Sequence, residues 1–218
     1  PNNLVLSKSS AGPEIEKMAE SLANENFRFP GIVGPSDVAS TFYNKWSQLT
    51  GQKSIEYMDQ IIYVLKQVLF PPPVAGEFRL ASLAEAPLIA EWMAAFARDA
   101  KMPKVEQLNE DSALKKAEDM INARRVSVWS VGGVAVAQAA VSGTDDVARI
   151  SMVYTPPESR GKGYASAVVA HLSQQQIEQG KKMCCLYADA RNPVSNSIYR
   201  KIGYEFVGRS SMYVLAPT

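Results

Sequence analysis

The sequence predicts a mixed α/β protein in two parts, a small N-terminal α/β domain over residues 1–76 and a larger domain with a mixed sheet over residues 77–218. The boundary is expected at Pro71, Pro72 and Pro73, because consecutive prolines supply no backbone donors and favour an extended chain. Beyond it, short β-rich runs alternate with amphipathic helical runs. A strand, helix, strand order near the end predicts a parallel pair inside an otherwise antiparallel sheet.

In the first part, apolar residues at helical spacing predict a helix over residues 13–23 and another from Val38 to a stop at Gly51. A proline and small polar residues before Val38 are typical of a helix start. A β-rich run predicts a short strand over residues 61–64.

In the second part, Gly132 and Gly133 predict a hairpin turn between two of three successive strands. The spacing of apolar and polar residues predicts the other strands and helices of this part. We expect strands over residues 77–80, 126–131, 134–141, 147–154 and 183–187, two terminal strands around 204–207 and 211–215, and helices over 83–100, 111–123, 164–179 and 193–202.

Composition limits the classes of partner. The formal net charge of +1 gives no reason to expect nucleic acid or a membrane surface as the main partner. Cys184 and Cys185 are neighbours in a strand-like run, where side chains point to opposite faces, so no disulfide between them is expected. No apolar run approaches the roughly 20 residues that span a bilayer. We therefore expect a cytoplasmic protein, monomer or homodimer; the start at Pro1 is consistent with a processed chain.

The most informative segment joins the strand over residues 147–154 to the following helix. Gly161 and Gly163 allow close approach of a ligand, and the first turn of the helix presents unpaired N–H groups at its positive end. Such a loop binds anions, and Arg160 and Lys162 add charge for a pyrophosphate. Dinucleotide-binding and P-loop patterns fit worse, because Ser166 stands where the first requires glycine or alanine, and the second requires a Gly-Lys-Ser/Thr ending that is absent. An ordinary glycine-rich turn remains the alternative.

A second motif lies over residues 192–204. Asn192 is expected to cap a short helix that begins at Pro193 and ends at Gly203. Two faces are predicted, one packing on the sheet and one polar face with a phenol. The packing face would hold Val194, Ile198 and Ile202, and the polar face Asn192, Ser195, Asn196 and Tyr199.

Together these segments resemble the GNAT N-acetyltransferase superfamily. The loop Arg160-Gly161-Lys162-Gly163-Tyr164-Ala165 looks like its Gln/Arg-x-x-Gly-x-Gly/Ala signature, and the second segment is similar to its Asn-x-x-Ala/Ser-x-x-x-Tyr-x-x-x-Gly-Phe/Tyr pattern. The resemblance covers residues 77–218. The N-terminal part resembles the degenerate half of some two-domain members.

The resemblance implies that acetyl-CoA is the acyl donor, that no metal is needed, and that Tyr199 is the general acid that protonates the departing thiolate. A backbone N–H near Val153 would stabilise the oxyanion. The residues that the resemblance assigns to the donor are Met152, Val153, Tyr154, Arg160, Gly161, Lys162, Gly163, Tyr164, Ala165, Asn192 and Ser195.

The acceptor is expected to be a small-molecule or peptide amine, and its identity stays open. Glu158, Tyr154 and Asp189 lie near the expected strand ends and could position a water that serves as base. His171 is expected to be a surface or boundary residue, and the cysteines to be packing residues. The competing hypothesis is a regulatory module that binds acyl-CoA without catalysis.

Overall fold

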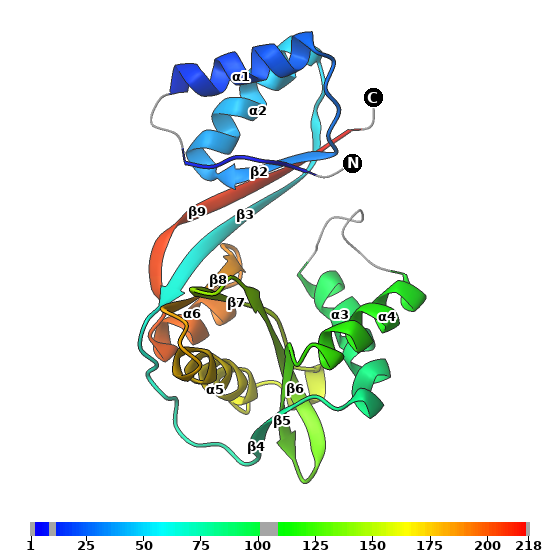
Figure 1. The fold of residues 1–218 in the computed structure, drawn as a ribbon, viewed down its shortest axis with the longest axis vertical. Coiled ribbons are helices and arrows are strands. Elements are labelled where there is room, and N and C mark those ends of the chain that lie inside the picture. Colours follow the sequence, from blue (N-terminus) through cyan, green and yellow to red (C-terminus); the bar gives the residue numbers. More distant parts are fainter. Residues whose placement is uncertain (1–2, 9–11, 101–108, 217–218) are drawn as a thin grey trace. The chain divides into compact units, whose positions relative to one another are not determined.

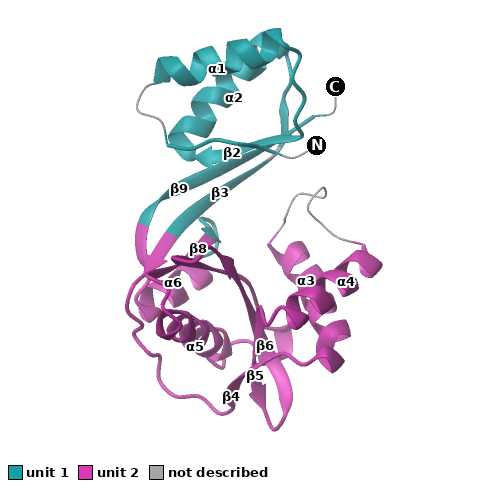
Figure 2. Ribbon diagram, in the orientation of Figure 1, with its two compact units in different colours: residues 1–62, 188–192, 207–218 teal, residues 63–187, 193–206 magenta. Residues whose placement is uncertain are grey.

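The computed structural model describes residues 3–8, 12–100 and 109–216. Two compact units divide the chain (Figure 2): unit 1 holds residues 1–62, 188–192 and 207–218, and unit 2 holds residues 63–187 and 193–206. This division differs from the one expected at residue 76, because unit 1 also takes in segments from the C-terminal part of the chain. The domain organisation proposed from the sequence stays a prediction.

Unit 1 is a small sheet covered by two helices (Figure 1). Strand β1 (Leu4–Val5) runs parallel to β2 (Gly31–Pro35), β2 is antiparallel to β9 (Glu205–Leu215), and β9 neighbours β3 (Ser54–Leu65). Helices α1 (Gly12–Asn24) and α2 (Ser36–Thr50) bury their apolar faces. The core of unit 1 includes Ile15, Ala19, Ile32, Phe42 and Trp46.

The predicted helix stop at Gly51 is confirmed. Gly51 adopts a left-handed φ of 72°, and its N–H donates to the carbonyl of Ser47. Two strand predictions were wrong: β3 has 12 residues where a short strand was expected, and the two expected terminal strands are one strand, β9. Strand β9 lies between β2 and β3 in the sheet, and its residues Ser210 to Val214 pair with β2; pairing with neighbouring strands thus extends β9 beyond what propensity alone predicts.

Unit 2 contains the predicted antiparallel meander. Neighbouring strands pair in the order β4 (Glu77–Leu80), β5 (Val126–Val131), β6 (Val134–Gly143) and β7 (Val147–Tyr154). Gly132 and Gly133 have φ values of 57° and 83°, so the hairpin turn between β5 and β6 needs both glycines. After helix α5 (Tyr164–Glu178), strand β8 (Met183–Asp189) pairs with β7 in parallel, as predicted.

Helices cover both faces of this sheet (Figure 1). Helices α3 (Ala86–Asp99) and α4 (Glu110–Asn122) pack on one face, and α5 lies on the other. A single 3-10 turn, η1 (Leu83–Glu85), precedes α3, and the Asn109 side chain caps α4 by accepting from the N–H of Ser112 at 2.8 Å. The last helix, α6 (Pro193–Ile202), has the predicted bounds.

Candidate functional site

The two parallel strands of unit 2 pair over only part of their length. Their register runs from Val147 opposite Met183 to Arg149 opposite Cys185, whereas β7 continues to Tyr154. Beyond Arg149, the described backbone ladder of β7 is formed with β6. The side of β7 that faces β8 is therefore an open strand edge over its last residues, where an extended ligand can add backbone hydrogen bonds.

A β-bulge lies on this open segment. The β6–β7 register shifts between the pairs Gln138–Tyr154 and Ala140–Ser151, so β7 has one residue more than β6. Met152 adopts a left-handed φ of 51°, and its carbonyl accepts a bond from Gln138 Nε2 at 3.4 Å. A bulge re-aims backbone groups, and here it does so at the edge where the donor thioester is expected.

The loop after β7 presents free backbone amides. It passes through a 3-10 turn, η3 (Pro157–Ser159), and reaches Gly161 and Gly163 with φ of 78° and 83°. In α5, the N–H of Ala167 donates to the carbonyl of Gly163, so the N–H groups of residues 164–166 precede the first helical acceptor. No side chain caps this end, the first turn holds no acidic residue, and residues 160–163 are exposed. These features are suited to an anion, and binding of the donor's diphosphate at this loop stays a prediction.

The two cations of the loop are engaged elsewhere. Arg160 Nη2 forms an ion pair with Asp99 Oδ2 of α3 at 2.6 Å, and its Nε donates to the carbonyl of Thr155. The hydrogen bond with Asp99 raises the pKa of Arg160. Lys162 Nζ donates to the carbonyl of Glu158 at 3.1 Å. The backbone amides, rather than these side chains, are the groups that the loop leaves available to an anion.

Tyr199 of α6 lies inside an aromatic cluster. Its ring is 8% exposed and lies 6.2 Å from the ring of Tyr63 and 6.0 Å from that of Tyr204. The Tyr204 hydroxyl is hydrogen-bonded to Ser173 Oγ of α5 at 2.8 Å, which fixes the cluster on that helix. Burial raises the pKa of Tyr199 to about 12, so the phenol carries its proton at neutral pH, as a general acid requires.

One prediction about α6 was wrong. Its buried residues are Asn196, Tyr199 and Ile202, and Val194 is 67% exposed. The buried face therefore follows i, i+3 spacing and includes the Tyr199 ring, whereas the predicted face followed i, i+4 spacing and was aliphatic. Burying the tyrosine removes more apolar surface from water than burying Val194 would. Ser195 is half-buried, and its role in donor binding stays a prediction.

Asn192 directly precedes α6 and belongs to the segment 188–192 of unit 1. Its N–H donates to the carbonyl of Asp189 at 3.0 Å, and Asp189 also forms an ion pair with Arg191. The proposed roles of Asn192 in donor binding and of Asp189 in positioning a water stay predictions.

The remaining candidate side chains are placed as follows. His171 is half-buried between the rings of Phe70, Phe78 and Trp129, and burial lowers its pKa. It is thus a boundary residue, as predicted. Burial raises the pKa of Cys184 to about 11, which disfavours a reactive thiolate.

Three features of the site had little signal in the sequence. Asp99 has no motif, and only the fold brings it to Arg160. Gln138 is 1% exposed, and a glutamine among alanines and valines was the only sign that this strand position is special. The third feature is Val74, whose Cγ1 lies 3.0 Å from the place that a Cβ on Gly163 would occupy.

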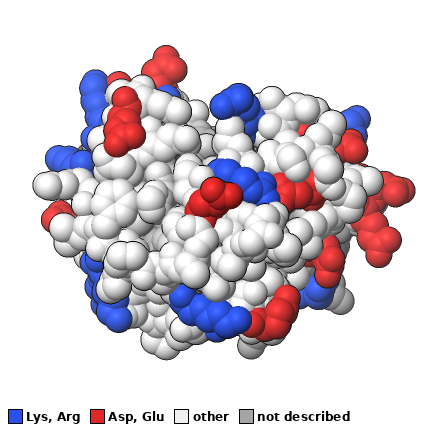
Figure 3. Space-filling view, turned by 90° about the horizontal axis from the view of Figure 1, so that it is seen from below, with Lys and Arg blue, Asp and Glu red and all other residues white. Residues whose placement is uncertain are grey.

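Within the described ranges, no three His, Cys, Asp or Glu side chains group so that they could hold a metal ion, and no helix is long and apolar enough to cross a membrane. On the face drawn in Figure 3, basic and acidic side chains are interspersed, without a large area of one sign.

Comparison with known proteins identifies the fold. Residues 133–214 match the family model described as FR47-like protein, and no curated protein sequence matches the chain significantly. An acetyltransferase of the GNAT family from Colwellia psychrerythraea matches with a TM-score of 0.62 and 12% identity, over 92% of this chain and 72% of that one. A GCN5-related N-acetyltransferase from Kribbella flavida matches with a TM-score of 0.61 and 18% identity, over 98% and 78%.

A third structure, a GCN5-related N-acetyltransferase from Sphaerobacter thermophilus, matches with a TM-score of 0.55 and 15% identity. The match covers 84% of this chain and 58% of that longer one. At such identities the likeness is one of fold. The mixed α/β fold and the family resemblance expected from the motifs are both confirmed: this chain has the fold of GNAT-family acetyltransferases, and its residues 133–214 match the FR47-like model.

Proposed function

We propose that this protein is an N-acetyltransferase that moves the acetyl group of acetyl-CoA to a primary amine. The observation that carries the proposal is the continuity of three features in unit 2: an open edge of β7, a bulge at Met152 on that edge, and exposed amides between Gly161 and the first turn of α5. Each suits a different part of one donor molecule, namely its pantetheine, thioester and diphosphate.

In the proposed reaction, the amides from Gly161 onward bind the diphosphate, and the edge of β7 orients the pantetheine. The acceptor nitrogen attacks the thioester carbon, a C–N bond forms, and the backbone N–H of Val153 donates to the oxyanion. One such donor contributes about 3 kcal/mol in other oxyanion sites. As the C–S bond breaks, Tyr199 gives its proton to the sulfur, and the proton released by the amine passes to water.

The raised pKa of Tyr199 bears on its role. Because the pKa is about 12, the phenol is always protonated at neutral pH, but it is a weaker acid than an exposed tyrosine. The thiol that forms has a pKa of about 8.5, so transfer from phenol to thiolate is uphill in isolation and depends on the thiolate developing next to the hydroxyl.

A second function is favoured by two observations. Arg160 is held by Asp99 and Thr155, and Tyr199 is almost fully buried, which suits a protein that binds acyl-CoA without turnover. Such a module would act as a sensor of acyl-CoA.

Calorimetry and a thioester assay separate the two functions. We expect acetyl-CoA to bind with measurable heat, and free CoA to appear when primary amines such as spermidine, L-lysine and a peptide with a free N-terminus are supplied. Stoichiometric binding without CoA release on any amine would support the sensor. Absence of any binding would reject both functions.

A further inference from the structure

Residues 69–76, called the strap from here on, belong to unit 2 and form most of the connection from β3 to β4. Pro71, Pro72 and Pro73 stiffen the middle of the strap, because proline fixes φ and favours an extended conformation. A stiff segment held at both ends has few ways to move, so the position of the residue beyond the prolines, Val74, is well defined.

Both ends of the strap are anchored. At one end, the N–H of Leu69 donates to the carbonyl of Ile202, the last residue of α6, at 2.7 Å. A Cβ on Gly203 would lie 3.2 Å from Leu69 Cγ, so the strap packs directly on the end of that helix. At the other end, the indole N–H of Trp129 donates to the carbonyl of Ala75 at 2.9 Å.

Between its anchors the strap reaches two further elements. The ring of Phe70 lies 5.1 Å from the imidazole of His171 on α5. Val74 Cγ1 lies 3.0 Å from the place that a Cβ on Gly163 would occupy. Gly163 directly precedes α5 in the left-handed conformation, so Val74 contacts the residue that aims the loop amides. A Cβ on Gly161, by contrast, would meet nothing within 4 Å.

We infer that Val74 is a positioning residue for donor binding: by packing on Gly163, it holds the loop amides in the direction that a diphosphate requires. The inference rests on the proposed function. Gly163 is required for two separable reasons, its φ of 83° and the volume of Val74, whereas Gly161 is required for its φ of 78° alone. The strap thereby sets the geometry of the loop from outside the sequence motif that defines it.

The first test is Val74→Ala, with Val134→Ala as matched control. Val134 is a 65% exposed valine of unit 2 in β6, so its truncation removes the same atoms without touching the loop. We expect Val74→Ala to raise the Kd of acetyl-CoA about 3-fold to 10-fold, the size expected when charge-assisted hydrogen bonds are misaligned. Val134→Ala should leave the Kd within about twofold.

The second test is a double-mutant cycle. Gly163→Ala should weaken acetyl-CoA binding strongly in the native background, and less in the Val74→Ala background, because the steric part of its cost is then gone. Gly161→Ala should weaken binding by the same factor in both backgrounds, since only its backbone conformation is affected. Melting temperatures identify any variant that loses its fold.

A third readout does not depend on the donor. Arg160 and Lys162 are exposed trypsin sites, and we expect Val74→Ala to speed cleavage there in the ligand-free protein, while Val134→Ala does not. If native protein binds no acetyl-CoA, the proposed function fails, and the cleavage rates still decide whether Val74 orders the loop. If native protein binds acetyl-CoA but Val74→Ala changes neither Kd nor cleavage, or if the cycle shows no coupling, the inference is overturned.

Discussion

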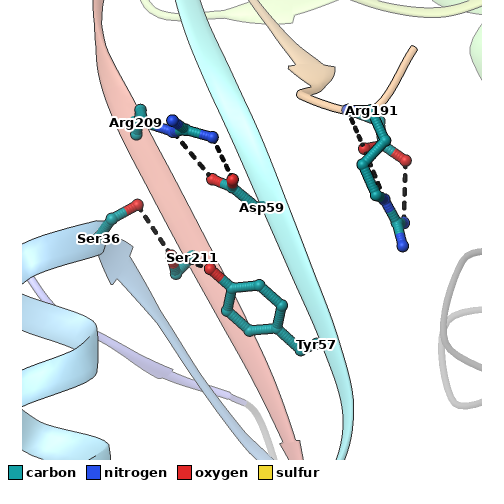
Figure 4. Close-up of polar contacts among 7 residues, drawn as sticks. Ser36, Tyr57, Asp59, Arg191, Arg209 and Ser211 are labelled. Atoms are coloured by element: carbon teal, nitrogen blue, oxygen red, sulfur yellow. Dashed lines mark hydrogen bonds and ion pairs between the residues drawn. The ribbon is translucent and has the colours of Figure 1, made fainter.

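Two strand-to-helix junctions, one in each unit, differ in the charge that the protein places at the start of the helix. In unit 1, β2 passes directly into α2 through Pro35, and Asp37 places a carboxylate in the first helical turn. Ser36 accepts a bond from Ser211, which is also bonded to Tyr57 (Figure 4). In unit 2, the junction from β7 to α5 has left-handed glycines, no acid and no cap.

The positive end of the helix dipole thus has a carboxylate of the protein in its first turn in one junction and none in the other. Nearby in unit 1, Asp59 and Arg209 also pair with each other (Figure 4). A helix N-terminus alone is therefore no indication of an anion site. Neither helix has a side-chain cap, so the acid in the first turn of α2 and its absence from α5 distinguish the two junctions.

The largest effect is expected for chemistry rather than binding. Tyr199→Phe removes only the proton that we assign to the leaving thiolate, so kcat should fall by about 100-fold or more, with the Kd of acetyl-CoA within about twofold. Rates of CoA release and calorimetry measure the two quantities. If kcat and the affinity for acetyl-CoA fell by the same factor, the Tyr199 hydroxyl would support the donor pocket and would supply no proton. Tyr63→Phe is the control, because it alters a neighbouring ring of the same cluster.

The next largest effect tests the contrast directly by closing the open junction. Ala165 and Asp37 are both the second residue of their helices, so Ala165→Asp gives α5 the acid that α2 already has. Repulsion of the diphosphate should raise the Kd of acetyl-CoA about 10-fold to 100-fold. Added salt screens this repulsion, so the difference in Kd between the variant and the native protein should become smaller as salt is added. Ala165→Asn is the neutral control of the same shape. Similar losses in both variants would point to volume, and would contradict an electrostatic origin.

A smaller effect is expected where the loop is tied to α3. Asp99→Asn removes the ionic partner of Arg160, which is then available to a phosphate. Donor affinity should rise by about two- to threefold, because exposed ion pairs contribute little. In an Arg160→Gln background, Asp99→Asn should no longer change the affinity for acetyl-CoA. A loss of affinity in Asp99→Asn would indicate that the ion pair holds the loop in its binding conformation.

The smallest effect on acetyl-CoA binding is expected at a third junction, from β4 to η1, where the side chain of Glu85 occupies the start of the turn. Glu85 accepts from the backbone N–H of Ser82 and pairs with Arg79 through both oxygens. The guanidinium of Arg79 lowers the pKa of Glu85 to about 2. The Glu85 carboxyl binds its proton less readily in the folded protein than in the unfolded chain, so its ionised form stabilises the fold. This contribution to the free energy of unfolding is complete above the unfolded pKa of 4.5 and is lost as pH falls towards 2.

Denaturant unfolding at several pH values checks this. Between pH 6 and pH 3, the free energy of unfolding of Glu85→Gln should decline less steeply than that of the native protein. Identical slopes would contradict a lowered pKa at this residue. Acetyl-CoA binding at neutral pH should be the same in both, because this junction is closed.

The sequence predicts best what is local. The glycine pair at residues 132–133, the stop at Gly51 and the loop before α5 each depend on backbone conformations that few residues adopt, and each is found where it was expected. The length of β3, the continuity of β9 and the outward position of Val194 depend on pairing or packing with distant segments. Propensity carries no information on those partners, which is why these predictions were wrong.

The candidate site follows the same rule. The glycines and Tyr199 belong to short motifs and could be named from the sequence, whereas Asp99, Gln138 and Val74 have no motif. Each of these three lies between 14 and 89 residues from the site residue that it contacts, Met152, Arg160 or Gly163, and only the fold brings them there.

The interleaved composition of unit 1 has a consequence for dissecting the protein. Its sheet combines β2, from the beginning of the chain, with β9, from the end, through an antiparallel ladder. A chain cleaved once within residues 69–76 would yield two polypeptides that both contribute strands to that ladder. The two pieces should copurify under native conditions and separate only in denaturant, which makes the protein a natural candidate for fragment complementation, whereas simple truncation at the prolines would strip unit 1 of a central strand.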